Sequence, residues 1–389
     1  MNWPTAQDFN EAVQNPSTAF ADPDLKSGEA VVGPTGLPMP RSGNFADVYQ
    51  FRTPAGKDWA VKCFTRYVPG LDDRYRKISA ALERASLPFT IGFSYLAEGL
   101  RVRGEWLPVL KMEWVEGLQL NQFVREFAGK PHRLDSLAAL WVKLCRRLRE
   151  AGVAHADIQH GNVLLVDGSR AGSLAVKLID YDGMFVKELE AKPSGELGHP
   201  CFQHPMRGPG RVYSANLDRF PALVVAAAVK GVSVLGPDVW EKYDTGDNLL
   251  FTEADFKNPA ASELMRELWA ADDPGLRSMV GHLALSCKRP MTQTPWLDEL
   301  APDGVAKPLS AAAARAAADV LGVPAPPVIV DAQPFPFPVI DAQPLVVAPV
   351  VDGQPLPPVV VDAQLLPPPV ETVMAEMVAG ARRGTPAAR

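Results

Sequence analysis

Two carboxylates and one carboxamide stand where they could act together on a phosphate group. Asp157 follows a histidine by two residues and precedes Asn162 by five, and the apolar stretch 163–165 comes directly after. The Asp157 carboxylate could accept the proton of a hydroxyl group, and the Asn162 amide oxygen could bind a metal ion. A second apolar stretch, 175–179, ends in Asp180, whose carboxylate could hold Mg²⁺ against phosphate oxygens. This spacing predicts phosphoryl transfer to a hydroxyl group.

A lysine and a glycine-containing turn earlier in the chain fit the same chemistry. Lys62 follows two apolar residues, and a strand at this place would hold its ammonium group rigidly against phosphates. In the run 40–49, Gly43, Phe45 and Val48 match a degenerate glycine-rich phosphate loop, in which two of the glycines are replaced. Taken alone, the lysine could lie on a surface edge strand and the turn could belong to an ordinary hairpin.

The stretch 110–117 is typical of a buried strand that ends in an extended connector. Met112, Glu113 and Val115 would lie there, and an adenine ring could form hydrogen bonds with the connector's backbone. An acidic partner for the lysine is sought on the following helix, where Glu83 is the best match by spacing, twenty-one residues after Lys62. Asp73 on the same helix is the second candidate, and Glu83 could also be a solvated helix charge.

The elements that would position these residues divide by their hydrophobic period. Short runs bounded by turns, with a hairpin tip at 103–105, predict a small sheet from strands at 46–51, 59–65, 100–102 and 106–114. One helix at 72–85 interrupts it, because apolar residues there share a helical face. After Gly117 leucines recur at helical spacing, and 220–235 is apolar enough for a buried helix. A strand-rich lobe with one helix, followed by a helical lobe, is therefore expected.

With these motifs in place, residues 37–300 resemble a eukaryotic-type (Hanks-type) protein kinase of a divergent, bacterial-style serine/threonine kind. The resemblance implies an α+β, bilobal fold with ATP and Mg²⁺ bound between the lobes. It also implies roles for single residues: Lys62 resembles the family's strand lysine, Asp157 its catalytic base, Asn162 and Asp180 its magnesium ligands, Met112 its gatekeeper, and Asp218 the aspartate that opens a buried helix and tethers the catalytic loop. The run 198–205 resembles the end of an activation segment.

The chain departs from the family pattern at several positions. Met206 replaces the glutamate that pairs with a late arginine, for which Arg289 is the candidate, so the anchoring of the activation segment is in question. Ala156 replaces the arginine that reads a phosphorylated loop, and Ser194 is the one hydroxyl acceptor between 184 and 197. We therefore expect activity without loop phosphorylation. Gln159 replaces a phosphate-contacting lysine, and Asp182 stands where the family has a glycine.

Composition separates the ends of the chain from this domain. The resemblance and the composition together predict an N-terminal extension at 1–36, a kinase-like domain at 37–301 with lobes at 37–116 and 117–301, an alanine-rich helix at 302–323, and a proline-rich tail at 324–389. Fourteen of the 38 prolines lie between 324 and 369, and this part of the tail repeats an Asp-Ala-Gln-Pro-like unit around Asp331, Asp341, Asp352 and Asp362. Proline at this density predicts an extended, disordered segment. It would act as a spacer or bind a partner through polyproline helices.

Charge and cysteine content exclude several classes of function. With 39 Lys and Arg against 45 Asp and Glu, the net charge of −6 disfavours nucleic-acid and membrane binding. The four cysteines are too far apart for a zinc or disulfide framework. We read no leader or membrane span in the sequence and expect a cytoplasmic protein.

Three functions remain open on the sequence alone. The first is an ATP- and Mg²⁺-dependent protein kinase that phosphorylates Ser or Thr hydroxyls of a protein substrate. The second is a small-molecule phosphotransferase, because the catalytic motifs also resemble those of aminoglycoside and choline kinases. The third is a pseudokinase scaffold. A kinase-like fold used only for docking partners has no physical need of Lys62, Asp157, Asn162 and Asp180 together, which argues against this function.

Overall fold

The structure is a computed structural model that describes residues 3–43, 45–170, 172–190, 197–208, 213–325, 350–351 and 354–355. The chain separates into two compact units, Met1–Val328 and Ile329–Arg389. In the second unit the described residues form one short antiparallel ladder, β10 (Val350–Val351) with β11 (Gln354–Pro355). The rest of the expected proline-rich tail lies outside the described residues. All further features belong to the first unit.

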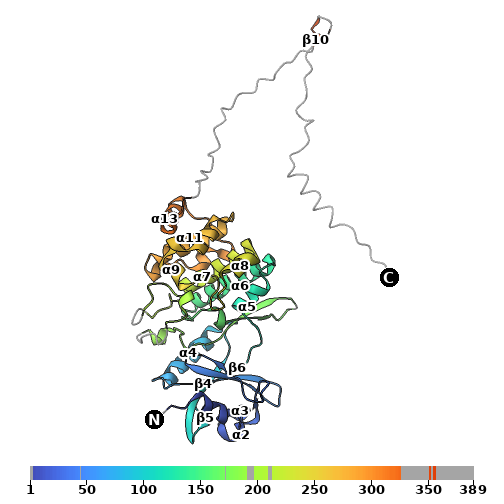
Figure 1. Cartoon of the computed structure of the whole chain (residues 1–389), viewed down its shortest axis with the longest axis vertical. Helices are drawn as coiled ribbons and strands as arrows, with labels where there is room; N and C mark the ends of the chain where they lie inside the picture. Colours follow the sequence, from blue (N-terminus) through green and yellow to red (C-terminus); the bar gives the residue numbers. More distant parts are fainter. Residues whose placement is uncertain are drawn as a thin grey trace, which may run out of the picture. The chain divides into compact units, whose positions relative to one another are not determined.

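An antiparallel sheet of six strands occupies the N-terminal end of this unit (Figure 1). Its strands are β1 (Glu29–Ala30), β2 (Arg41–Ser42), β3 (Ala46–Arg52), β4 (Asp58–Phe64), β5 (Phe93–Val102) and β6 (Glu105–Glu113), in the order β1-β3-β4-β6-β5 with β2 also on β3. The expected hairpin tip is present, with Arg103 and Gly104 at φ 51° and 89°. Strand β5 begins seven residues earlier than expected, because its first half is partly exposed and carries an irregular register that hides the alternation.

The two faces of the sheet are covered by different helices. On one face, α4 (Leu71–Ala85) packs through Tyr75, whose ring lies 5.5 Å from Phe93 and 5.8 Å from Tyr95 between centroids. On the other face lie the short helices α1 (Ala6–Val13), α2 (Pro16–Ala19) and α3 (Pro23–Ser27), whose apolar side chains pack against Tyr49 and Val61. Alternate residues of β3 and β4 supply the two cores, as the two-residue period of a strand requires. Within the expected N-terminal extension 1–36, the helices of the described residues 3–36 are thus part of the packed structure.

Helices form most of the rest of the unit. They are α5 (Leu120–Glu126), α6 (Pro131–Glu150), α7 (Arg219–Leu235), α8 (Pro237–Tyr243), α9 (Glu253–Lys257), α10 (Glu263–Ala270), α11 (Pro274–Cys287), α12 (Leu297–Leu300) and α13 (Ala311–Leu321). A small sheet, β7 (Leu118–Gln119), β8 (Val163–Asp167) and β9 (Leu174–Leu178), lies among them. The fold is therefore a mixed α/β one with antiparallel sheets and many helices. Among the described residues, no helix combines the length and apolar character of a membrane span.

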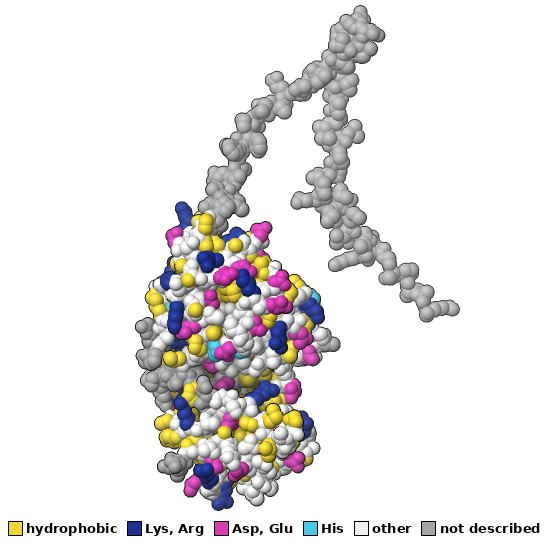
Figure 2. Space-filling view, viewed as in Figure 1, with side chains coloured by type: hydrophobic (Ala, Val, Ile, Leu, Met, Phe, Trp, Pro, Cys, Tyr) yellow, Lys and Arg dark blue, Asp and Glu magenta, His cyan; other side chains and the backbone are white. Residues whose placement is uncertain are grey.

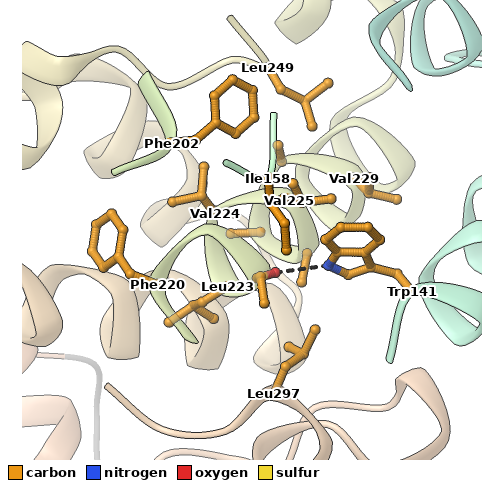
Figure 3. Close-up of a cluster of buried hydrophobic side chains, with 14 of the residues drawn as sticks. Trp141, Ile158, Phe202, Phe220, Leu223, Val224, Val225, Val229, Leu249 and Leu297 are labelled. Atoms are coloured by element: carbon orange, nitrogen blue, oxygen red, sulfur yellow. Dashed lines mark hydrogen bonds between the residues drawn. The ribbon is translucent and has the colours of Figure 1, made fainter. Parts of the chain in front are cut away.

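Helix α7 forms the centre of the helical part. Its residues from Phe220 to Val229 are all buried, because the helix is apolar on every side. Figure 3 shows Trp141 of α6 directed at this helix, where its indole nitrogen donates to the Ala222 carbonyl oxygen at 3.0 Å. The alanine-rich helix α13 also joins this core, with Ala317, Ala318 and Leu321 buried.

We expect Trp141→Phe to lower the free energy of unfolding by about 1–3 kcal/mol, because it removes a buried hydrogen bond and part of a fully buried ring. Urea unfolding followed by circular dichroism measures the change. The matched control is Trp106→Phe, at a side chain that is 39% exposed, and it should change stability by less than about 0.5 kcal/mol. Equal effects of the two variants would contradict this account of the core.

The attachment of the N-terminal helices is tested at Lys111. Its Nζ lies 2.7 Å from both Asp22 and Asp24, so Lys111→Met should lower the melting temperature and expose the 3–30 segment to proteolysis. Lys57→Met is the matched control, because Lys57 is exposed yet lies over the same Trp59 ring as Lys111. If both variants resist protease like the wild type, the ion pairs do not hold the segment.

Candidate active site

Lys62 connects the sheet to the helical part of the unit. It lies on the inner strand β4 between Val48 and Leu110, and its side chain is only 5% exposed. Its Nζ donates to Asp180 Oδ1 at 2.8 Å and to Asp182 Oδ2 at 2.7 Å. Burial alone would lower the pKa of Lys62, but the two carboxylates raise it above its usual value. The ammonium group is therefore charged at neutral pH.

The two carboxylates that meet Lys62 follow directly after β9. Asp180 has a left-handed backbone, with φ 63°, and its side chain is 41% exposed. Asp182 is only 13% exposed, and its second oxygen accepts a hydrogen bond from the hydroxyl of Tyr75 on α4. Burial acts to raise the pKa of both groups. The charge of Lys62 reverses this effect for Asp180, whose pKa is lowered, whereas the neighbouring Asp180 adds to it for Asp182, whose pKa is raised.

Asp157 and Asn162 form a second pair of contacting polar groups. The Asn162 amide nitrogen donates to Asp157 Oδ2 and to the Asp157 carbonyl oxygen, both at 3.0 Å. The other carboxylate oxygen of Asp157 accepts the backbone N–H of His199 at 3.0 Å. A Cβ placed on Gly183 would lie 3.6 Å from the Cβ of Asp157, so the turn after Asp180 packs directly against the Asp157 side chain. The predicted acid, amide and amine thus belong to one contiguous cluster.

Asp218, at the start of α7, holds the loop that carries Asp157. Its buried carboxylate accepts the backbone N–H groups of His155 at 2.5 Å and of Ala156 at 2.8 Å. The His155 ring in turn contacts the carbonyl oxygen of Ile179 at 2.9 Å, which joins this loop to the end of β9. Asp218 thus fixes the backbone of this loop at the start of α7.

The residues predicted to bind the nucleotide divide between the two faces of the sheet. Val48 pairs with Lys62, and Met112 pairs with Ala60, so these side chains share the face that carries Lys62. Glu113 pairs with Trp59, is exposed, and belongs to the opposite face.

The remaining three residues predicted at the nucleotide, Gly43, Phe45 and Val115, lie in the connections that flank the strands. Gly43 is exposed and donates its N–H to the Ala46 carbonyl oxygen at 2.9 Å, which closes the turn in which Phe45 is half-buried. Val115 is half-buried in the connector after β6. At the junction of sheet and helices, the surface is indented (Figure 2).

The structure does not bring Glu83 to Lys62, contrary to the expectation from spacing. Glu83 is exposed on α4 and accepts a hydrogen bond from Ser79 at 3.0 Å. It lies eight residues after Tyr75, the residue through which the helix reaches this site, which is about 12 Å along a helix axis. Asp73, the second candidate, pairs with Arg76 and Lys77 at 2.8 Å each.

Three residues that contact the site carry little or no signal in the sequence. In the sequence Asp182 stands out only as a replacement for glycine, and nothing in its neighbourhood indicates a contact with Lys62. The helical period predicts Tyr75 only as a core residue of the helix. Arg207 carried no signal, yet its guanidinium donates to the Ala156 carbonyl oxygen at 2.7 Å and to Gln203.

The segment after residue 197 is anchored by other contacts, although position 206 carries no glutamate. Besides the Arg207 contact, His204 bonds to the carbonyl oxygen of Ser286 at 2.9 Å. Met206 is 38% exposed and donates its backbone N–H to the His204 ring. The expectation about Ser194 falls on 191–196, which lies outside the described residues.

The chemistry of the donor set suits a magnesium ion held together with phosphates. Asn162 uses its amide nitrogen to contact Asp157, which leaves its oxygen, the end that a hard cation prefers, for another partner. Asp180 is the more exposed of the two carboxylates at Lys62. Within the described part of the chain, no group of three or more His, Cys, Asp or Glu side chains could hold a metal ion by itself. A carboxylate and an amide that share the ion with phosphates would fit this arrangement.

Comparison with known proteins finds similarity only at the level of solved structures. No family model matches the sequence, and no curated protein matches it. Among solved structures, the chain is similar to the BubR1 kinase domain, with a TM-score of 0.39 and 19% sequence identity. The match covers 55% of this chain and 65% of that chain, so it spans less than two thirds of that structure.

Proposed function

We propose that the unit Met1–Val328 is an ATP- and Mg²⁺-dependent protein kinase that transfers the γ-phosphoryl group to Ser or Thr hydroxyls. The observation that carries this proposal is the Lys62 ammonium group, which is 5% exposed and lies 2.8 Å from the carboxylate of Asp180. A rigid cation beside a partly exposed carboxylate is what binding a polyphosphate with its metal ion requires. The sheet holds the first group and the end of β9 holds the second.

The proposed roles follow from the contacts of each side chain. Asp157 accepts the proton of the attacking hydroxyl while the new oxygen–phosphorus bond forms and the bond from phosphorus to the bridging oxygen of ATP breaks. Asn162 fixes the orientation of Asp157 through its 3.0 Å amide contact. A carboxylate has about four acceptor sites, so Asp157 can still accept a substrate hydroxyl beside the donors that it already has.

Asp180 and Asn162 would hold Mg²⁺, and Lys62 would contact the phosphates. When bound, the ion supplies positive charge that neutralises the phosphate oxygens during transfer. On the same face as Lys62, Val48 and Met112 offer apolar surface for the adenine ring.

A protein acceptor is favoured by the segment 197–208, which lies directly against Asp157. The His199 N–H contacts the carboxylate at 3.0 Å, and Arg207 ties the segment to the loop that carries it. Such an anchored backbone beside the base could position an extended peptide. The Asp157 carboxylate could equally accept the proton of a small alcohol. A scaffold would use the kinase-like fold without any turnover. The experiment below separates these functions.

We expect Asp157→Asn to lower phosphoryl transfer by at least about 100-fold, since the proton acceptor is lost. The measurement is mass spectrometry of phosphosites after incubation of peptide arrays and a panel of small alcohols with ATP and Mg²⁺. Asp167→Asn, at an exposed aspartate at the end of β8, is the matched control and should keep wild-type turnover.

The outcomes separate the three functions. Phosphopeptides that depend on Asp157 support the kinase. Phosphate found only on small alcohols would identify a small-molecule phosphotransferase. If no phosphate is transferred and nucleotide with Mg²⁺ does not raise the melting temperature, the result would support the pseudokinase scaffold.

The sequence prediction about loop phosphorylation is tested separately. Ala156 has no charge with which to read a phosphate, so Ser194→Ala should keep most of the wild-type turnover. A variant that loses most of its turnover, assayed on the same peptides, would refute activity without loop phosphorylation.

A further inference from the structure

Asp182 is bound at both of its carboxylate oxygens. Oδ2 lies 2.7 Å from the Lys62 ammonium, and Oδ1 accepts the hydroxyl of Tyr75. Because each oxygen has its own donor and the side chain is 13% exposed, the carboxylate has little freedom to rotate. Such a group fixes the position of the cation that it contacts.

Asp180, the other carboxylate at Lys62, has a second task in the proposed reaction. It is 41% exposed and is the carboxylate assigned to the metal ion. A carboxylate that contacts a dication interacts less favourably with a neighbouring ammonium group, because its negative charge is partly neutralised. Lys62 then depends on Asp182 as the counter-ion that remains.

Helix α4 holds Asp182 in place through two successive residues. Arg74 donates to the Asp182 carbonyl oxygen at 2.8 Å and to the Met184 carbonyl oxygen at 3.0 Å, and it also contacts the Tyr213 hydroxyl at 2.8 Å. Tyr75 adds its bond to the Asp182 carboxylate, while its ring is fully buried against the sheet. The helix therefore forms hydrogen bonds with both the backbone and the side chain of Asp182.

We propose that Asp182 is the positioning residue for Lys62, and that α4 acts on Lys62 through Tyr75 and Asp182 and not through a glutamate of its own. This inference rests on the proposed function, because it describes how the phosphate-contacting lysine is held. It also accounts for the exposed position of Glu83, which has no contact with Lys62 to make.

The test is Asp182→Asn, which keeps the shape of the side chain and an oxygen for Tyr75 but removes the charge. Affinity for a non-hydrolysable ATP analogue, measured by calorimetry at saturating Mg²⁺, should fall by about 10- to 100-fold, in line with the loss of one close charge pair. The KM for ATP should rise with it. Tyr75→Phe keeps the buried ring and should shift the same affinity in the same direction by about 3- to 10-fold.

Two matched controls accompany these variants. Asp72→Asn removes an exposed carboxylate from the first turn of α4, and Tyr95→Phe removes the hydroxyl of a neighbouring, half-buried ring. Both should keep the wild-type affinity for the analogue within about twofold. Glu83→Gln is measured alongside, and a loss as large as that of Asp182→Asn would overturn the proposal.

A magnesium titration of analogue binding distinguishes positioning from metal ligation. Asp180→Asn should raise the Mg²⁺ concentration needed for half-maximal binding, whereas Asp182→Asn should leave it unchanged. If Asp182→Asn raises that concentration as much and binds normally at saturating Mg²⁺, Asp182 is a metal ligand and the proposal is wrong. If Asp182→Asn does not fold, Tyr75→Phe decides alone, and wild-type affinity in that variant would overturn the proposal.

Failure of the proposed function gives a different result. In that case the wild type itself neither binds the analogue with Mg²⁺ nor transfers phosphate. A wild type that does both, with Asp182→Asn and Tyr75→Phe equal to it, refutes only the role of Asp182.

Discussion

A buried ammonium group must be matched by negative charge, and in this protein Lys62 imposes that requirement on the whole site. Desolvation of a lysine in an interior costs several kcal/mol unless anions and hydrogen bonds compensate it. At Lys62 the compensation comes from Asp180 and Asp182, which lie more than a hundred positions further along the chain. The sheet and the end of β9 must therefore meet at this point, and the position of each depends on the other.

The helical part meets this requirement because its loops are attached to one buried helix. Asp218 at the start of α7 binds two successive N–H groups of the loop before Asp157, and the His155 ring continues the contact to the end of β9. Ala156 and Asp180 both have left-handed backbones, with φ 65° and 63°. For alanine this conformation costs about 1–2 kcal/mol, so the surrounding contacts hold it. Strain of this kind is characteristic of functional sites.

The sheet is a rigid support because both of its faces are packed. The N-terminal helices cover one face, and Lys111 joins them to β6 through two aspartates. Helix α4 covers the other face and contributes Tyr75 and Arg74 to the turn after β9. A helix that binds both the sheet and this turn could transmit its position to Lys62 without a direct contact.

Several features of the site were predictable because their signals are local. The apolar strands before Lys62 and Asp180, the apolar helix α7 and the helical face of Tyr75 follow from residue periods within one segment. The run from Asp157 to Asn162 is short enough that its amide contact is almost dictated by the loop itself. The positions of strands β3, β4 and β6 and of helices α4, α6 and α7 follow from the same local patterns.

Only the tertiary structure decided which charges meet. The two partners of Lys62, Asp180 and Asp182, are 118 and 120 positions away, and Tyr75 is 107 positions from the Asp182 carboxylate. A prediction from spacing chose Glu83 because it considered one helix and one strand, whereas the turn after β9 fills the space between them. Long-range ion pairs depend on how separate elements pack, and packing is set by the summed burial of many side chains. The pattern of apolar residues within one segment carries no information about how separate elements pack. The contacts of Asp182 and Arg207 could therefore be recognised only in the folded chain.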